Sequence, residues 1–110
     1  MFKVIKNPTF TAKVNVSVPT EGGQISSSFT GRFKAISVTE AEKFNLLSGD
    51  GTTEYLRAIF IGWGEDLVDE DGQPIAFCDA ARDELIDIPF VRVGILNSFN
   101  AAMMGAKRGN

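Results

Sequence analysis

The residues best suited to chemistry in this sequence are carboxylates gathered in one short segment. They are Glu65, Asp66, Asp69, Glu70 and Asp71. An EF-hand calcium loop with Gly72 as its sixth residue would have Leu67 and Cys78 as its end ligands, and neither side chain supplies oxygen. Paired carboxylates also cleave glycosides, but these crowd onto one turn with no sign of a cleft. The sequence therefore predicts a solvated acidic turn and no metal site.

The sequence lacks the residues that enzymes most often use for nucleophilic and acid–base catalysis. The chain has no histidine, and its one cysteine is Cys78. Histidine-based acid–base catalysis, histidine-activated nucleophiles and imidazole-ligated zinc are therefore excluded. The glycines at positions 22, 23, 62 and 64 match neither a phosphate-binding loop nor a dinucleotide fingerprint. We expect no catalytic residue, no metal and no cofactor, and we expect Cys78 to be buried or partly buried.

Two features are better suited to binding another protein. Trp63 stands between two glycines; it is interpreted first as a core anchor and second as an exposed partner-binding residue. The segment from Pro89 to Ala106 has helical spacing and more apolar positions than one core-facing stripe needs. Core packing is again the first interpretation, and a partner or oligomer surface is the second. The candidate contact residues are Leu96, Asn100, Met103, Met104 and Trp63.

Charge and composition narrow the classes of function. The 110 residues are 44% apolar, 23% charged and carry a net charge of −3, which is ordinary for a globular domain. Residues 1–38 hold five cations and one carboxylate, residues 39–88 three cations and thirteen carboxylates, and residues 89–110 three cations alone. This balance argues against binding nucleic-acid phosphates. The acidic middle is interpreted first as a solvated surface and second as a docking face for a basic partner.

Membrane and secretion signals are not evident. Uninterrupted apolar runs such as Ala58 to Ile61 are far shorter than the roughly 20 residues of a membrane span. The first ten residues have no apolar signal-peptide region. We therefore expect a cytoplasmic protein that does not contact a membrane.

Hydrophobic periodicity changes near residue 38. Apolar and polar residues alternate over 10–18 and again over 24–35, which predicts a long antiparallel hairpin with one apolar face and a turn at 19–23. Residues 2–5 are expected to add a short strand to it, and Gly31 to mark a bulge.

Helical spacing follows. A capping box at Thr39 and Glu42 predicts a helix to about residue 47, and a second helix runs from residue 52 or 53 to the glycines around Trp63. A third spans about 79–86, and the fourth begins at Pro89. The predicted fold is α+β: one domain, 1–38 mainly β and 39–110 mainly α, with an N-terminal antiparallel sheet followed by three to four packed helices. The expected core residues are Val14, Val16, Phe29, Phe33, Leu56, Phe60, Leu85 and Phe99.

Four stretches of the sequence stand out together: residues 1–10, 32–35, 62–72 and 100–110. They read MFKVIKNPTF, RFKA, GWGEDLVDEDG and NAAMMGAKRGN. With these stretches in this order, the whole chain resembles the small tail assembly chaperones of long-tailed phages and prophages. None of these motifs has a known chemical role, so the resemblance rests on their order and joint presence.

The resemblance implies a non-enzymatic helper in the host bacterial cytoplasm. It would bind the tape measure protein, keep that long helical chain soluble, help recruit major tail tube subunits, and be absent from the finished virion. Two alternatives come from other classes. One is a small virion structural protein of the tail or head–tail junction, and the other is an enzyme that uses only carboxylates, which needs a deep pocket with raised carboxyl pKa values. A homo-oligomer is a further expectation for the surplus apolar surface.

Overall fold

The fold begins with a long β-hairpin in the computed structural model, which describes residues 1–105. Strand β1 (Thr9–Thr20) pairs antiparallel with β2 (Gly23–Lys34) through a two-residue turn. Val14 and Phe29 are cross-strand partners and both are buried, whereas the residues between the apolar ones face solvent. The predicted hairpin is confirmed, because alternation with one buried face fixes both the strand and its register.

A third strand, β3 (Phe60–Trp63), pairs antiparallel with β2 and gives the sheet order β1-β2-β3. The prediction that the preceding helix continues to Trp63 is therefore wrong. Phe60 is buried beside Phe33. A buried apolar residue at this position is compatible with the apolar stripe of a helix and with a strand, so the sequence pattern did not distinguish the two. The bulge expected at Gly31 is also misplaced, because the register shift lies between Arg32 and Phe33 in the pairing with β3.

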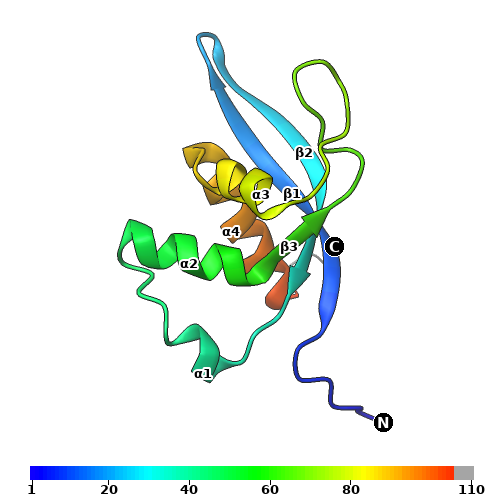
Figure 1. Ribbon diagram of the computed structural model, residues 1–110, viewed down its shortest axis with the longest axis vertical. Helices are drawn as coiled ribbons and strands as arrows, with labels where there is room; N and C mark the ends of the chain where they lie inside the picture. Colours follow the sequence, from blue (N-terminus) through cyan, green and yellow to red (C-terminus); the bar gives the residue numbers. More distant parts are fainter. Residues whose placement is uncertain (106–110) are drawn as a thin grey trace.

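The N-terminal arm, residues 1–7, forms no strand, which corrects the expectation for residues 2–5. Phe2 is 86% exposed and Val4 is 68% exposed. The backbone rejoins the sheet at Pro8, whose carbonyl O accepts a hydrogen bond from the N–H of Ala35 at 2.9 Å. The arm leaves the body at the start of β1, at the end opposite the hairpin tip (Figure 1).

The helices within residues 1–105 are α1 (Val38–Ala41), α2 (Gly49–Ile59), α3 (Asp79–Ile86) and α4 (Pro89–Met103). The positions of α3 and of the start of α4 confirm the prediction, with proline in the first turn of α4. Helix α4 ends at Met103, with Met104 as its C-cap, so it is shorter than the predicted helix to about residue 106, a position that lies outside the described residues.

The first two helices begin at serines that the sequence analysis did not select. Ser37, not Thr39, caps α1 by accepting the N–H of Glu40, and α1 ends at residue 41 rather than 47. Ser48 caps α2 by accepting the N–H of Gly51 at 2.9 Å, so α2 begins before residue 52. A Cβ at Gly51 would lie 1.9 Å from the carbonyl O of Asn45, so the backbone of Asn45 can approach the first turn of α2 only because residue 51 is glycine.

Cys78 also differs from the expectation. Its side chain is exposed, and its sulfur accepts the N–H of Ala81 at 3.4 Å at the start of α3. The thiol therefore serves as a helix cap and is not a core residue.

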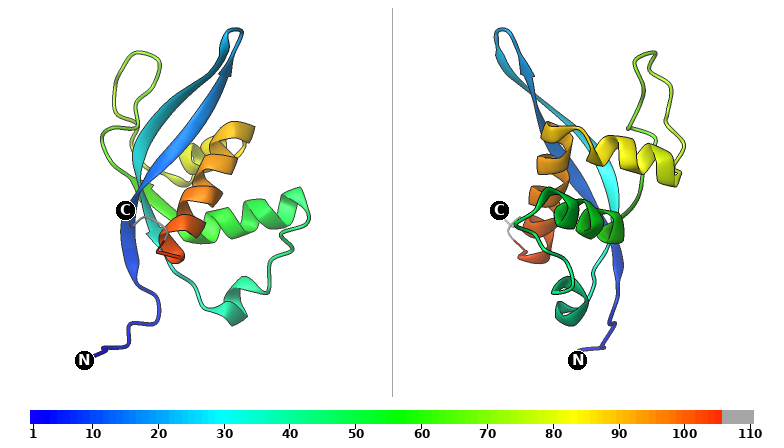
Figure 2. Two further views of the ribbon diagram at one scale, coloured as in Figure 1. Left: turned by 180° about the vertical axis from the view of Figure 1, so that it is seen from behind. Right: turned by 60° about the vertical axis from the view of Figure 1, so that its left-hand side comes forward.

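The helices cover one face of the sheet, and the hairpin tip extends beyond them (Figures 1 and 2). Their shared core with the sheet includes Val14, Val16, Phe29, Phe33, Leu56, Phe60 and Phe99, as predicted. Leu85 is only partly buried, because α3 lies at the margin and buries Ile86 instead. The α+β prediction is confirmed. No helix in residues 1–105 is long and apolar enough to cross a membrane.

Candidate functional site

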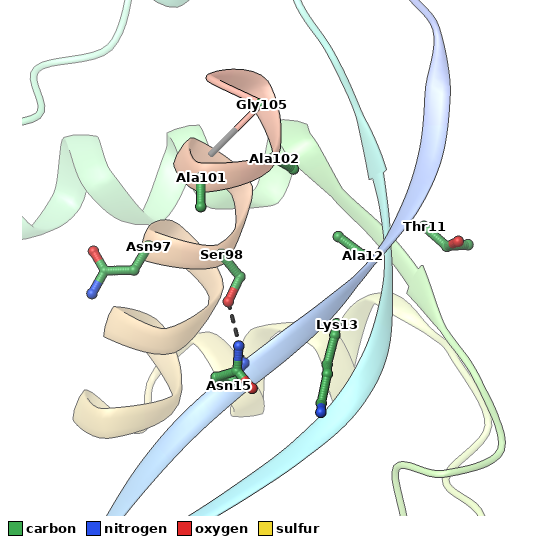
Figure 3. Close-up of a pocket in the computed structure, with 9 residues that line it drawn as sticks. All are labelled: Thr11, Ala12, Lys13, Asn15, Asn97, Ser98, Ala101, Ala102 and Gly105. Carbon is green, nitrogen blue, oxygen red and sulfur yellow. Dashed lines mark hydrogen bonds between the residues drawn. The ribbon is translucent and has the colours of Figure 1, made fainter. Parts of the chain in front are cut away.

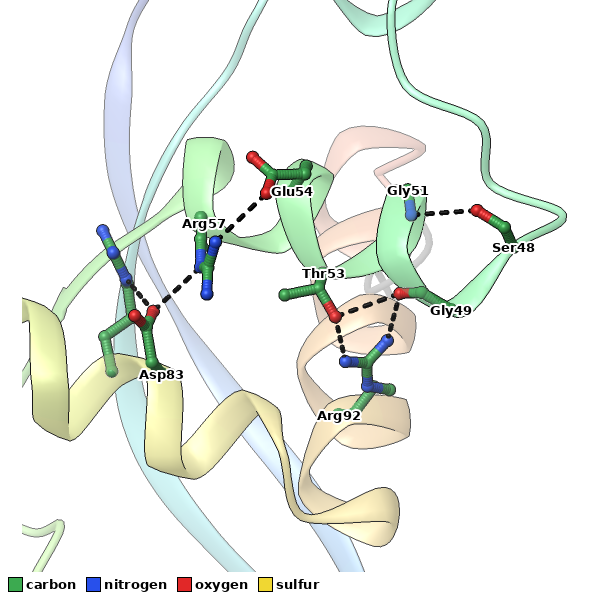
Figure 4. A network of polar contacts seen from close by, with 9 residues as sticks. Ser48, Gly49, Gly51, Thr53, Glu54, Arg57, Asp83 and Arg92 are labelled. Atoms are coloured by element: carbon green, nitrogen blue, oxygen red, sulfur yellow. Dashed lines mark hydrogen bonds and ion pairs between the residues drawn. The ribbon is translucent and has the colours of Figure 1, made fainter.

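The most concentrated polar network links α2 with α3 (Figure 4). The Oδ1 atom of Asp83 accepts hydrogen bonds at 3.1 Å from the Nε atoms of Arg57 and Arg82. Burial acts to raise the pKa of Asp83, but the hydrogen bonds and positive charges of the two arginines outweigh it, so the pKa is lowered. A carboxylate held ionised between two guanidinium groups is suited to joining helices rather than to donating protons.

A second set of hydrogen bonds, centred on Arg92, joins α4 to the same two helices. Its guanidinium donates to the carbonyl O of Ile86 at 3.0 Å, to the carbonyl O of Gly49 at 3.2 Å and to the hydroxyl of Thr53. One side chain thus ties the first turn of α2 and the end of α3 to α4. Figure 4 shows its bonds to Gly49 and Thr53. The network fixes the position of α4, which carries most of the candidate contact residues.

Acidic side chains within residues 65–71 hold the loop after β3 in place through hydrogen bonds to β2 and within the loop. Asp66 accepts the backbone N–H of Thr30 at 3.0 Å and the Thr30 hydroxyl at 2.9 Å, and these bonds lower the pKa of Asp66. Asp69 accepts the N–H groups of Asp71 and Gln73 at 2.9 Å. Within residues 1–105, no group of three or more cysteine or acidic side chains is arranged to hold a metal ion.

Trp63 lies in β3 and is partly buried. Its Nε1 donates to the carbonyl O of Ile75 at 2.6 Å, and its ring packs against Phe60 and Phe77 with centroid distances of 5.6 and 4.9 Å. These contacts hold the loop after β3 against the sheet. The structure therefore does not bring Trp63 together with the candidate contact residues on α4.

The candidate residues on α4 differ in exposure. Leu96 is partly buried against the core, so its surface is mostly used within the protein. Asn100 is exposed, and Met103 and Met104 are 51% and 81% exposed. Val93 is a further exposed apolar residue on the same helix. The outer side of α4 thus presents flexible apolar side chains to solvent at its C-terminal end.

Other exposed apolar residues lie toward the same end of the molecule. The last turn of α4, helix α1 and the N-terminal arm all lie at the end opposite the hairpin tip (Figures 1 and 2). We define the apolar end by the exposed residues of α1, its connection to α2, and α4: Val38, Leu46, Leu47, Met103 and Met104. Exposed apolar side chains that form a patch on a soluble protein are typical of an interaction surface.

A groove separates α4 from β1 and has a volume of about 1030 Å³ (Figure 3). It is closed at one point, where Ser98 Oγ accepts the backbone N–H of Asn15 at 3.2 Å. Further along, Thr11 and Lys13 line one wall, and Ala101 and Ala102 line the other.

The sequence analysis missed this groove, although the sequence carries a signal for it. Gly94, Ser98 and Ala102 repeat every four residues and form a stripe of small side chains on α4. Such a stripe lets another backbone approach a helix closely, but the sequence alone does not show which backbone approaches.

Comparison with known proteins found no matching family model, no matching curated protein and no matching solved structure.

Proposed function

We propose that this chain is a non-enzymatic tail assembly chaperone of a long-tailed phage or prophage. It binds the tape measure protein in the host bacterial cytoplasm, keeps it soluble and assists assembly of the tail tube. The observation that carries the proposal is the apolar end: Met103 and Met104 are 51% and 81% exposed, and helix α1, with its own exposed apolar residue, lies toward the same end of the molecule as the last turn of α4. The sequence resemblance supports the identity of the client.

The chemistry of the apolar end suits a long helical client. Each apolar side chain that a client covers contributes up to about 1.5–3 kcal/mol when fully buried. Methionine side chains are flexible and polarizable, so Met103 and Met104 adapt to successive turns of a client helix with different side chains. An amphipathic helix laid across the end of α4 would cover its own apolar stripe and this surface together.

The charged residues support a binding role over catalysis. Asp83, Arg57 and Arg92 are engaged in contacts between helices, and Asp66 is engaged with Thr30. Both carboxylates have a lowered pKa, whereas an enzyme relying on carboxylates needs one with a raised pKa.

Co-expression tests this function. The tape measure gene of the phage or prophage that the proposal assigns to this chain is expressed alone, with the wild-type chain, and with a chain carrying Met103→Asp and Met104→Asp. We expect soluble tape measure protein only with the wild-type chain. Equal solubility in all three cultures would contradict the proposal.

A virion structural protein is a second candidate, favoured by the hairpin. Its tip projects beyond the helices (Figure 1), and Ile25 near the tip is 58% exposed. A projecting strand pair is a plausible assembly element between neighbouring subunits. Mass spectrometry of purified particles separates the two candidates, because a chaperone is absent from particles and a structural subunit is present in a fixed ratio to the tube protein.

A further inference from the structure

We propose that two copies of this chain exchange their N-terminal arms, each arm adding an antiparallel strand to the free edge of β1 in the other copy. The occupant of the groove between β1 and α4 is thus residues 1–6 of a second copy. This proposal concerns self-association and does not depend on the identity of the client.

The edge of β1 that faces the groove has unused hydrogen-bonding groups. In an antiparallel strand, alternate residues direct both N–H and C=O to the same side. The N–H of Asn15 bonds to Ser98 on α4, and Pro8 O bonds to β2, so the odd-numbered residues face the groove. Within residues 1–105, nothing bonds the outward groups of Thr11 and Lys13. Such an open edge is a template for another strand.

The arm has the properties of the missing strand. Phe2 and Val4 alternate with Lys3, the pattern of a strand with one apolar face. No part of residues 1–105 pairs with the arm, and its apolar side chains are exposed. Six extended residues span about 20 Å, which matches the six edge residues from Pro8 to Lys13 and stops short of Asn15, where α4 closes the groove.

An antiparallel register that places Phe2 beside Ala12 fits both the alternation of the arm and the alternation of β1. Val4 then lies beside Phe10, and Lys3 lies beside Thr11 rather than beside Lys13. Cross-strand partners direct their side chains to the same face, so Phe2 and Val4 enter the groove on the side of Ala101 and Ala102, while Lys3 faces solvent. The small side chains of α4 leave room for the phenyl ring.

Exchange between copies is favoured over folding back within one copy. To reach the edge of its own β1, the arm would have to reverse direction at Asn7 and Pro8. The residue before a proline is restricted to extended conformations, and Pro8 is already aligned with the sheet through its bond to Ala35. An extended arm instead reaches a second copy related by a two-fold axis near residue 7, where both arms pair at once.

The size of the contact sets the expected strength. Six arm residues and six edge residues give about 12 residues per copy, roughly half of the 20–30 per side in a standard stable interface. The dimer is therefore expected to depend on concentration. Sedimentation of the full chain over a concentration series up to about 0.5 mM measures it.

A groove-filling variant tests the site. Ala101→Arg places a long side chain in the groove from an exposed helix position, and we expect it to weaken dimerisation at least tenfold. Ala80→Arg is the matched control on exposed α3, and it should leave the dimer unchanged. Met104→Asp should also leave it unchanged, which separates this surface from the apolar end. A wild-type chain that stays monomeric, or equal effects of Ala101→Arg and Ala80→Arg, would overturn the proposal.

A disulfide test distinguishes exchange from folding back. Phe2→Cys and Ala12→Cys are combined in a Cys78→Ser background, because directly opposite strand residues lie within disulfide reach. We expect covalent dimers on mild oxidation, and a reducing agent should return them to monomers. Neither single-cysteine variant should form covalent dimers at the same level. Disulfide-bonded monomers would show that the arm folds back on its own edge. An absence of disulfides would also refute arm exchange. So would a groove that binds a segment of the tape measure protein and not the arm of a second copy.

Discussion

Gly94 of α4 packs directly on the backbone of Asn15 in β1. A Cβ at position 94 would lie 2.6 Å from the Asn15 carbonyl O and 3.2 Å from Cγ2 of Val16. One turn later, Ser98 accepts the N–H of Asn15. The helix therefore crosses the edge strand through a glycine, and this crossing fixes where the groove closes.

Gly94→Ala is expected to lower the free energy of unfolding by about 1–3 kcal/mol, because a backbone carbonyl must move to admit the methyl group. Urea denaturation measures the change. Gly49→Ala is the control, since a Cβ there meets open space at the start of α2, and it should be neutral or stabilising by up to about 1 kcal/mol. Equal midpoints for Gly94→Ala and wild type would show that the close approach does not exist.

Asp66 gives the fold a pH-dependent contact. The Thr30 backbone N–H and hydroxyl lower the pKa of Asp66 in the folded state below its value in the unfolded chain. The contact therefore contributes stability above the unfolded-state pKa of about 3.9 and loses it as pH falls through the folded-state pKa. Asp66→Asn should lower the melting temperature at pH 6, and the difference from wild type should vanish toward pH 2.

The partner of Asp66 provides an internal check on that pH dependence. Thr30→Val removes the hydroxyl donor but keeps the backbone N–H, so it should produce a smaller loss at pH 6 than Asp66→Asn. Melting curves of Asp66→Asn and wild type that differ equally at pH 2 and pH 6 would show that the ionised carboxylate is not the stabilising species.

Arg92 is expected to be essential to the packing of α4. Arg92→Met leaves two carbonyl groups and the Thr53 hydroxyl without their shared donor, and the loss should be about 1–3 kcal/mol in urea denaturation. Arg92→Lys should rescue little, because an ammonium group cannot reproduce the planar set of donors. Lys43→Met, which removes an exposed ion pair to Glu40, should change stability by less than about 0.5 kcal/mol. If Arg92→Met lowered the free energy of unfolding by no more than Lys43→Met does, Arg92 would not be essential to the packing of α4.

Divalent cations are expected to leave stability unchanged. Asp66 and Asp69 use their oxygens to bind backbone N–H groups in the loop, and the segment lacks the end ligands of an EF-hand. Melting curves in EDTA and in millimolar calcium should therefore superimpose. A shift of more than a few degrees would show that this loop binds calcium after all.

Local patterns in the sequence predicted the elements that local interactions determine. The hairpin follows from strict alternation, because a one-residue slip would expose Val14 and Phe29 together. Helix α4 begins at Pro89, whose fixed φ and missing N–H suit a first turn. These signals act within a few residues, so no knowledge of the tertiary fold was needed.

Elements that depend on distant partners were not predictable in the same way. Phe60 and Trp63 continue the helical spacing of Leu56 and Ile59, and only pairing with Gly31 and Phe33 of β2 makes residues 60–63 a strand. The groove likewise depends on where α4 crosses β1. The exposed Met103 and Met104 were anticipated from the excess of apolar positions on α4, whereas the use of Leu96 in the core was not.

Capture of the tape measure protein by immobilised chain is the most direct test of the proposed chaperone function. Wild type is compared with Met104→Asp at the apolar end and with Ile25→Asp, a matched apolar-to-acidic change at the opposite, hairpin end. Because both side chains are more than half exposed, circular dichroism should show all three chains folded. The account predicts strong capture by wild type and Ile25→Asp and about tenfold less by Met104→Asp. Undiminished capture by folded Met104→Asp, or no capture by wild type, would contradict it.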